Sequence, residues 1–238
     1  MSAPPMGAEP EGSSVVALRR PATSTVLTYD DGPTPGVTDR LLPVLAEAGA
    51  TATFFVLLTR VRAHLGLLHE VLAAGHEIGL HGSDHRRLTT LPAEAMPARF
   101  RDAKAELEDL AAVPVRWSRP PYGAQDLVSW RAARDAGLMP VLWSVACRDW
   151  ETHPAEKYLA ELRSTDLTGR VVLLHDGFAD ERDGVNDGPE PVLDRIELTR
   201  GVLEAVAASG LTGHSLGSAL EDVEPERAPW LEELGDPA

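Results

Sequence analysis

Cysteine and basic residues are scarce in this sequence of 238 residues. The single cysteine, Cys147, excludes an intramolecular disulfide framework. Only 22 lysines and arginines stand against 37 aspartates and glutamates, which gives a formal net charge of −15. Such a charge repels phosphate backbones and anionic membrane surfaces, so neither nucleic acid nor a membrane is expected as a partner.

Long apolar runs are also missing. No segment approaches the roughly 18 consecutive apolar residues that a membrane-spanning helix needs. Residues 1–15 contain neither the basic region nor the apolar core of a secretory signal, which predicts a cytoplasmic protein. The hydrophobic fraction of 43% and the charged fraction of 25% are typical of one globular domain with a substantial core.

Strand-like apolar runs alternate with helical stretches between Ser24 and Leu216. This alternation predicts a parallel β/α architecture, either an open doubly wound sheet or a barrel. The expected strands are 25–29, 52–57, 77–80, 115–117, 139–145, 170–175 and 211–215, and the expected helices are 37–48, 63–74, 92–111, 127–136, 154–164 and 191–208. Four of the helical stretches end in a glycine that suits a left-handed cap: Gly49, Gly75, Gly137 and Gly210.

The two ends of the sequence differ in composition from its middle, because they are rich in proline, glycine and acidic residues. We therefore expect a flexible N-terminal tail over 1–14, one folded domain over 15–220 and an acidic C-terminal tail over 221–238. The polar segment 180–191 is expected to be a long surface loop. It contains an aspartate-rich run that superficially resembles a calcium loop but lacks the required ligand spacing.

Four polar clusters stand where expected strands end, which is where sites assemble in β/α folds. The first cluster, 28–33, contains the adjacent carboxylates Asp30 and Asp31. One can bind a metal while its neighbour remains free as a base. Alternatively, the cluster is only an Asx-turn that closes a strand.

The second cluster places His81 and His85 four residues apart. Two imidazoles with this spacing can face one metal ion, and with one carboxylate they form a catalytic zinc set that leaves a position for water. The alternative is a pair of surface histidines in a polar loop.

The third and fourth clusters suit the stabilisation of an oxyanion and the transfer of a proton. Paired prolines between Arg119 and Tyr122 fix the backbone, as a preorganised N–H donor requires, although a structural turn would look the same. The fourth cluster combines Asp149–Trp150 with His175 at the end of a buried strand. A histidine there can act as a general acid or simply be a hydrogen-bonded core residue.

Taken in order, Tyr-Asp-Asp-Gly-Pro, His-x₃-His, Arg-x-Pro-Tyr, Asp-Trp and Leu-x-His resemble the motifs of the polysaccharide deacetylases (NodB-homology domain, carbohydrate esterase family 4). The resemblance covers about Ser24 to Leu220 and implies a distorted (β/α)7 barrel for the catalytic domain. Two positions depart from the family pattern. Gly82 stands where a serine or threonine is common, and Ala146 stands where a second acidic residue is common.

The resemblance implies that Asp31, His81 and His85 bind one divalent metal and that Asp30 is the catalytic base. Zn²⁺ fits a ligand set of two histidines and one aspartate, although Co²⁺, Ni²⁺ or Mn²⁺ could occupy the same site. A bound metal lowers the pKa of its water from about 15.7 to about 7 and polarises the carbonyl.

The remaining roles follow from the same resemblance. Arg119 would hold Asp30 in position and pair with Asp149. The backbone N–H of Tyr122 would bind the oxyanion, and His175 would protonate the leaving amine. The small acyl pocket would be lined by Trp150 and Leu173.

The activity implied is metal-dependent hydrolysis of an N-acyl amide, with N-acetyl as the expected group, on an amino sugar or sugar-containing metabolite. Metal-bound water would be the nucleophile. Two alternatives keep the fold: a hydrolase of formyl groups, cyclic amides or ureides, and a non-catalytic binding module. A serine-hydrolase elbow at 213–217 is discounted, because His214 is the last histidine and no base follows Ser215.

Overall fold

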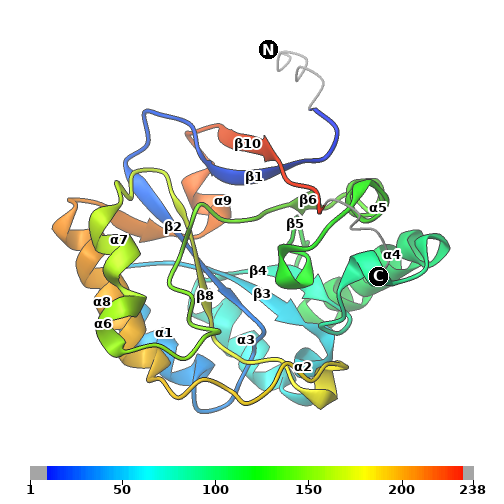
Figure 1. The fold of residues 1–238 in the computed structure, drawn as a ribbon, viewed down its shortest axis with the longest axis horizontal. Helices are drawn as coiled ribbons and strands as arrows, with labels where there is room; N and C mark the ends of the chain where they lie inside the picture. The colour runs from blue at the N-terminus through cyan, green and yellow to red at the C-terminus, as the bar shows by residue number, and fades with distance from the viewer. Residues whose placement is uncertain (1–9, 233–238) are drawn as a thin grey trace.

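A curled parallel sheet surrounded by helices forms the centre of the computed structural model, which describes residues 10–232 (Figure 1). The strands follow the order β6-β5-β4-β3-β2-β8-β7, and β9 pairs with β2 beside this path. The expected distorted barrel is thereby confirmed. The strand bounds are β2 Ser24–Asp30, β3 Thr53–Leu57, β4 Glu77–Gly82, β5 Trp117–Ser118, β6 Met139–Pro140, β7 Val145–Ala146, β8 Val171–His175 and β9 Thr212–His214.

Helices follow most of the strands, and the four expected glycine caps all adopt positive φ. Their bounds are α1 Thr38–Glu47, α2 Leu58–Ala63, α3 Leu65–Ala73, α4 Met96–Ala111, α5 Leu127–Asp135, α6 Ala155–Tyr158, α7 Ala160–Ser164, α8 Arg195–Ala208 and α9 Leu216–Ala219. The described residues also form four short 3₁₀ turns: η1 Leu88–Thr90, η2 Ala93–Ala95, η3 Pro121–Gly123 and η4 Glu181–Asp183.

The expected strand over 139–145 is instead two short strands, β6 and β7, which lie at opposite ends of the sheet path. The chain therefore crosses from one edge of the sheet to the other within a few residues. Across the open seam between these edges lies a further strand, β1 (Ser13–Leu18). Val15 of β1 bridges to Val141 after β6, and Ala17 bridges to Arg170 before β8, so β1 links the two sides of the seam.

The tail boundaries predicted from composition are wrong, because both predicted tails contain residues of a strand. Strand β1 begins at Ser13, and Pro225–Pro229 form strand β10. Strand β10 (Pro225–Pro229) pairs antiparallel with β1, and the pairs run from Ser13 with Pro229 to Leu18 with Pro225 (Figure 1). Polar residues and prolines suit β10, because its side chains are exposed or half-buried and it needs no alternating apolar face, whereas β1 is largely buried. Residues 1–9 and 233–238 of the predicted tails lie outside the described residues.

Side chains of β2 point alternately into two apolar clusters, one beneath the helices and one inside the barrel. Leu27 and Tyr29 point outward into the large cluster beneath the helices, and Val26 points into a second cluster inside the barrel. Because strand side chains alternate, Thr28 and Asp30 lie on the same inward face as Val26. The barrel interior thus changes from apolar side chains to a polar group at the carboxyl end of β2.

Candidate active site

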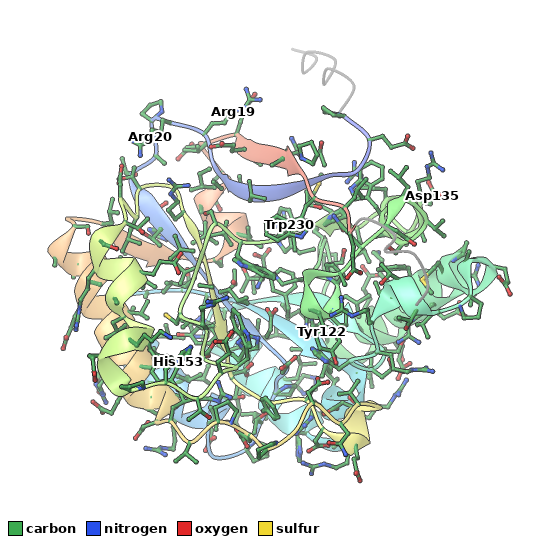
Figure 2. The ribbon with its side chains drawn as sticks, viewed as in Figure 1. Arg19, Arg20, Tyr122, Asp135, His153 and Trp230 are labelled. Atoms are coloured by element: carbon green, nitrogen blue, oxygen red, sulfur yellow. The ribbon has the colours of Figure 1, made fainter. Side chains whose placement is uncertain are left out.

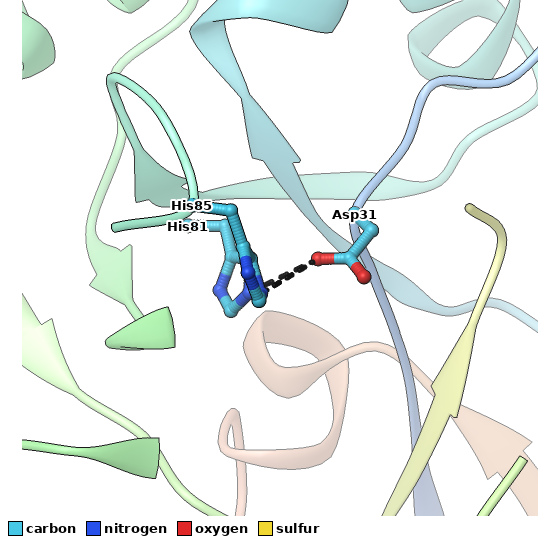
Figure 3. Close-up of side chains that lie close together, drawn as sticks. All are labelled: Asp31, His81 and His85. Carbon is cyan, nitrogen blue, oxygen red and sulfur yellow. Dashed lines mark ion pairs between the residues drawn. The ribbon is translucent and has the colours of Figure 1, made fainter. Parts of the chain in front are cut away.

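Three side chains converge at the carboxyl ends of β2 and β4. The Nε2 atoms of His81 and His85 each lie 3.3 Å from Oδ1 of Asp31, and all three residues are buried (Figure 3). Asp31 adopts φ of 75°, an uncommon conformation for a residue other than glycine, and this turns the chain at the end of β2. The structure therefore brings together the three residues that the sequence predicted as metal ligands.

The donor atoms of this cluster suit a divalent cation. One ligand atom from each residue lies within 4.8 Å of the other two. Oδ1 of Asp31 is buried without a hydrogen-bond partner, so the three atoms converge at ion-pair distance but without hydrogen bonds among them. The other ring nitrogen of His81, Nδ1, lies 2.9 Å from the carbonyl oxygen of Arg119, which fixes the imidazole with Nε2 toward Asp31.

The charges around the cluster keep Asp31 ionised. Burial opposes its ionisation, but the adjacent His81 and the charges of His85 and His175 outweigh this cost and hold the pKa of Asp31 below its ordinary value. Burial lowers the pKa of His85, although Asp31 opposes this shift. An ionised carboxylate and a neutral imidazole are the protonation states in which these groups bind a metal.

Asp30 lies beside the cluster and is held by Arg119. Nη1 of Arg119 donates to Oδ1 of Asp30 at 2.7 Å and to Oγ1 of Thr28 at 2.9 Å. The guanidinium lies 4.2 Å above the ring of Phe55 and also donates to two backbone carbonyls after β6. Since Arg119 occupies Oδ1, the other oxygen of Asp30 is left near the cluster, with Oδ2 3.9 Å from Nε2 of His81.

The predicted pairing of Asp149 with Arg119 is wrong, because Asp149 contacts His175 and Arg195 instead. Its Oδ1 lies 2.8 Å from Nδ1 of His175, and its Oδ2 accepts hydrogen bonds from the backbone N–H of His175 at 2.9 Å and from Arg195 at 3.1 Å. Burial would lower the pKa of His175, but the charge and hydrogen bond of Asp149 raise it to about 9. The carboxylate of Asp149 therefore favours the protonated form of the His175 imidazole.

His175 also lies next to Asp30 in the sheet, because the parallel register of β2 and β8 pairs these two residues. The following residue, Asp176, is buried and accepts a hydrogen bond from Thr38, and burial raises its pKa to about 7. A side chain at Gly32 would place its Cβ 2.0 Å from Oδ2 of Asp176. Glycine is thus required after the two aspartates, because the side chain of Asp176 packs directly against this position of the turn.

The third predicted cluster forms η3, which carries Tyr122 at the rim of the site. Tyr122 adopts φ of 61°, its ring lies 4.5 Å from that of His85, and its hydroxyl donates to Asp187 at 2.6 Å. The guanidinium of Arg87 lies 4.7 Å above the same ring. These contacts on the ring and hydroxyl fix the turn at Tyr122 beside the proposed metal ligands.

These residues surround a pocket of about 380 Å³, within the range of small-molecule sites. Trp150 and Leu173 line it as predicted, and the ring of Trp150 lies 5.5 Å from that of His175. The sequence interpretation did not include the other lining residues: Arg87, Gly123, Trp143, Phe178, Ala179 and Asp187. Trp143 could have been proposed from its place near the end of the expected strand 139–145, but no local pattern indicates the others or the buried Arg195.

The polar segment 180–191 contributes Asp187 to the lining of the pocket and is anchored through Asp183. Arg60 donates to both carboxylate oxygens of the fully buried Asp183 and to the carbonyl of Phe178. The carbonyl of Asp183 in turn accepts the backbone N–H of His85 at 2.9 Å. Part of the expected surface loop therefore supports a predicted metal ligand.

The departure at Gly82 has a conformational reason. Its φ is 158°, and a Cβ at this position would lie 2.5 Å from the carbonyl oxygen of Asp84. The loop between His81 and His85 is thus closed too tightly for a side chain at this point. Glycine here accompanies the convergence of the two imidazoles rather than disrupting it.

Fold and site together define a β/α-barrel hydrolase with a centre of two histidines and one aspartate. Residues 18–141 match the polysaccharide deacetylase family. The chain is 32% identical over 189 residues to a chitooligosaccharide deacetylase of Azorhizobium caulinodans, which covers 79% of this chain and 90% of that protein. It is 35% identical over 156 residues to a peptidoglycan-N-acetylglucosamine deacetylase of Bacillus cereus, covering 65% and 73% of the two chains.

Solved structures show the same fold. A family 4 carbohydrate esterase pseudoenzyme from Bacillus anthracis matches with a TM-score of 0.74 at 20% identity, covering 87% of this chain and 68% of that one. A T48 deacetylase with bound substrate matches with a TM-score of 0.70 at 28% identity, covering 86% and 94%. The chain belongs to the polysaccharide deacetylase family, and the two deacetylases named above are hydrolases of carbon–nitrogen bonds other than peptide bonds. Among residues 10–232, no helix is long and apolar enough to cross a membrane.

Proposed function

We propose that this protein is a metal-dependent N-deacetylase that hydrolyses the N-acetyl amide of an amino sugar. The observation that carries the proposal is the convergence of Asp31, His81 and His85 without hydrogen bonds to one another, next to Asp30 and His175 on neighbouring strands. This arrangement combines a cation site with two separate proton carriers. Hydrolysis of an amide needs both, because the carbonyl must be activated and the amine leaves only when protonated.

Asp31, His81 and His85 would hold the divalent metal, and Zn²⁺ fits this ligand set, although Co²⁺, Ni²⁺ and Mn²⁺ also bind nitrogen and oxygen ligands. When bound, the metal supplies Lewis acidity at the carbonyl and favours deprotonation of water. The chain itself supplies the orientation of the ligands through the carbonyl of Arg119 and the backbone contact of His85.

The proton transfers are assigned to two side chains. Asp30, oriented by Arg119, accepts the proton of the attacking water. His175 is kept protonated by Asp149 and donates its Nε2 proton to the leaving amine, since Nδ1 is bound to the carboxylate. The backbone N–H of Tyr122, on the rigid turn η3, donates to the developing oxyanion.

The pocket supports an amino sugar as the substrate. Tyr122, Trp143 and Trp150 line it and would supply aromatic surface to a sugar ring, while Leu173 would supply an apolar contact for the acetyl methyl group. Two relatives are named as deacetylases of chitooligosaccharide and of peptidoglycan N-acetylglucosamine. The cytoplasmic localisation stays a prediction from the sequence.

The test is release of acetate and formate from N-acylated glucosamine oligomers by the purified protein, with and without chelator and after reconstitution with each metal. Acetate release that chelator abolishes and metal restores would support the proposal. Turnover of N-formyl or cyclic amides without acetate release would instead favour the alternative hydrolase. Full metal loading without turnover of any amide would favour a binding module.

A further inference from the structure

The segment after β10 crosses the surface to the rim of the active site. Residues 230–232, here called the C-terminal brace, are bonded to Gln125, three residues after Tyr122. The side-chain amide of Gln125 donates to the carbonyl of Trp230 at 2.6 Å, and the backbone N–H of Glu232 donates to the carbonyl of Gln125 at 2.7 Å. In Figure 2, Trp230 lies between the β1–β10 pair and Tyr122.

The side chains of the C-terminal brace reach the same turn by two further routes. The ring of Trp230 lies 5.4 Å from that of Trp143, which packs so closely on Gly123 that a Cβ there would be 2.7 Å from it. Glu232 pairs with Arg87 at 2.6 Å, and Arg87 covers the ring of Tyr122. Glu232 also accepts a hydrogen bond from Thr89 at 2.7 Å.

Tyr122 needs such support, because a tyrosine at φ of 61° is strained. A strained turn keeps its conformation only where the surrounding contacts fix it. Contacts from the C-terminal brace enclose the turn on both sides, through Trp143 against Gly123 and through Arg87 against the ring. The backbone N–H of Tyr122 is thus held by a segment that lies far from it in the sequence.

We infer that the C-terminal brace is a positioning element of the active site, in which Trp230 and Glu232 hold the turn at Tyr122 in the geometry that stabilises the oxyanion. This inference rests on the proposed function for the catalytic part of its test. The positioning itself is a property of the turn and can be measured without a substrate. It assigns a role to a part of the chain that composition alone would place outside the domain.

The experiment compares the full-length variants Glu232→Ala and Trp230→Leu with the control Glu224→Ala. Glu224 also forms an exposed ion pair with an arginine, Arg19, but at the far end of β10. We expect Glu232→Ala to lower kcat for acetate release about three- to tenfold, with KM and metal content unchanged, because misplacement of a catalytic group costs rate rather than binding. Glu232→Gln keeps one acceptor oxygen and should restore part of the rate.

Hydrogen–deuterium exchange of the peptide over 122–126 supplies the second measurement. Its amides should exchange faster in Glu232→Ala and Trp230→Leu than in the wild type or Glu224→Ala. Exchange and kcat equal to those of the control would overturn the inference, as would a fall in kcat that metal loss accounts for. A wild type without acetate release would refute the proposed function alone, and the exchange comparison would still decide the role of the C-terminal brace.

Discussion

Replacing Asp149 with asparagine removes the carboxylate that keeps His175 protonated. The pKa of His175 rises from an ordinary value of 6.5 to about 9, with burial acting against the rise and Asp149 contributing most to it, ahead of Asp31 and Asp30. This difference corresponds to about 3 kcal/mol of stabilisation of the imidazolium. Asparagine can still contact Arg195 and the backbone N–H of His175, so the change acts mainly on charge.

The consequence for activity depends on pH. In the wild type, the raised pKa keeps His175 protonated at neutral pH, so the rate should fall only as the pH approaches about 9. A metal held by Asp31 would repel the imidazolium and lower its pKa, so the rate should fall at a pH no higher than about 9. In Asp149→Asn the pKa of His175 falls, because the main contribution that raises it is lost. A return to the ordinary value of 6.5 would leave about a tenth of His175 protonated at pH 7.5. We therefore expect kcat/KM to fall about 10- to 100-fold at pH 7.5 and to recover in part below pH 6.

The assay is the pH profile of kcat/KM for acetate release, together with a nitrogen NMR titration of His175. Glu190→Gln is the matched control, since Glu190 is the exposed partner of Arg195 and does not touch His175. Thermal unfolding checks that Asp149→Asn remains folded with Arg195 less well paired. If kcat/KM of the variant fell only at the same high pH as that of the wild type, Asp149 would not set the protonation of His175. The assignment of His175 as the acid would then lose its support.

Three further results are expected. Asp31→Asn should abolish stoichiometric metal binding, whereas Asp30→Asn should keep the metal and lower kcat by about 10²–10⁴-fold; metal analysis beside kinetics would expose the reverse assignment. Arg60→Met leaves the buried Asp183 uncompensated and should lower the free energy of unfolding by about 3–5 kcal/mol, measured by urea denaturation, while an unchanged midpoint would contradict the anchoring role of this pair. Chelation should lower the melting temperature, because a metal at 100 times its Kd adds about 2.7 kcal/mol of stability; equal melting curves with and without metal would argue against a metal site in the folded protein.

The strand ends of the barrel were the predictable part of this protein. Apolar runs and glycine caps located the strands, and the parallel topology then brought Asp31 together with His81 and His85. This succeeded because the pattern along each strand is local and the carboxyl ends of parallel strands meet at one side of the sheet. The roles of these residues in catalysis stay proposals.

The pairing of Asp149 could not be predicted in the same way. Arg119 and Arg195 are both buried, and the choice between them depends on three-dimensional position. Arg195 begins α8 behind an aspartate cap and has no motif of its own. Strands β1 and β10 were missed for a related reason, since their pairing joins opposite ends of the described chain and β10 is too polar to show a strand pattern.

The β1–β10 pair also determines the order in which the protein can be assembled during synthesis. The register joins residue 13 to residue 229, so β1 is translated first among the described strands but lacks its antiparallel partner until β10 leaves the ribosome. Contacts of such long sequence separation form late and slow the folding of a domain. Until then the backbone edge of β1 that pairs with β10 is open, and an unpaired strand edge makes a nascent chain prone to aggregation. The final fold and a complete catalytic rim would therefore arise together, after translation of residues 225–232.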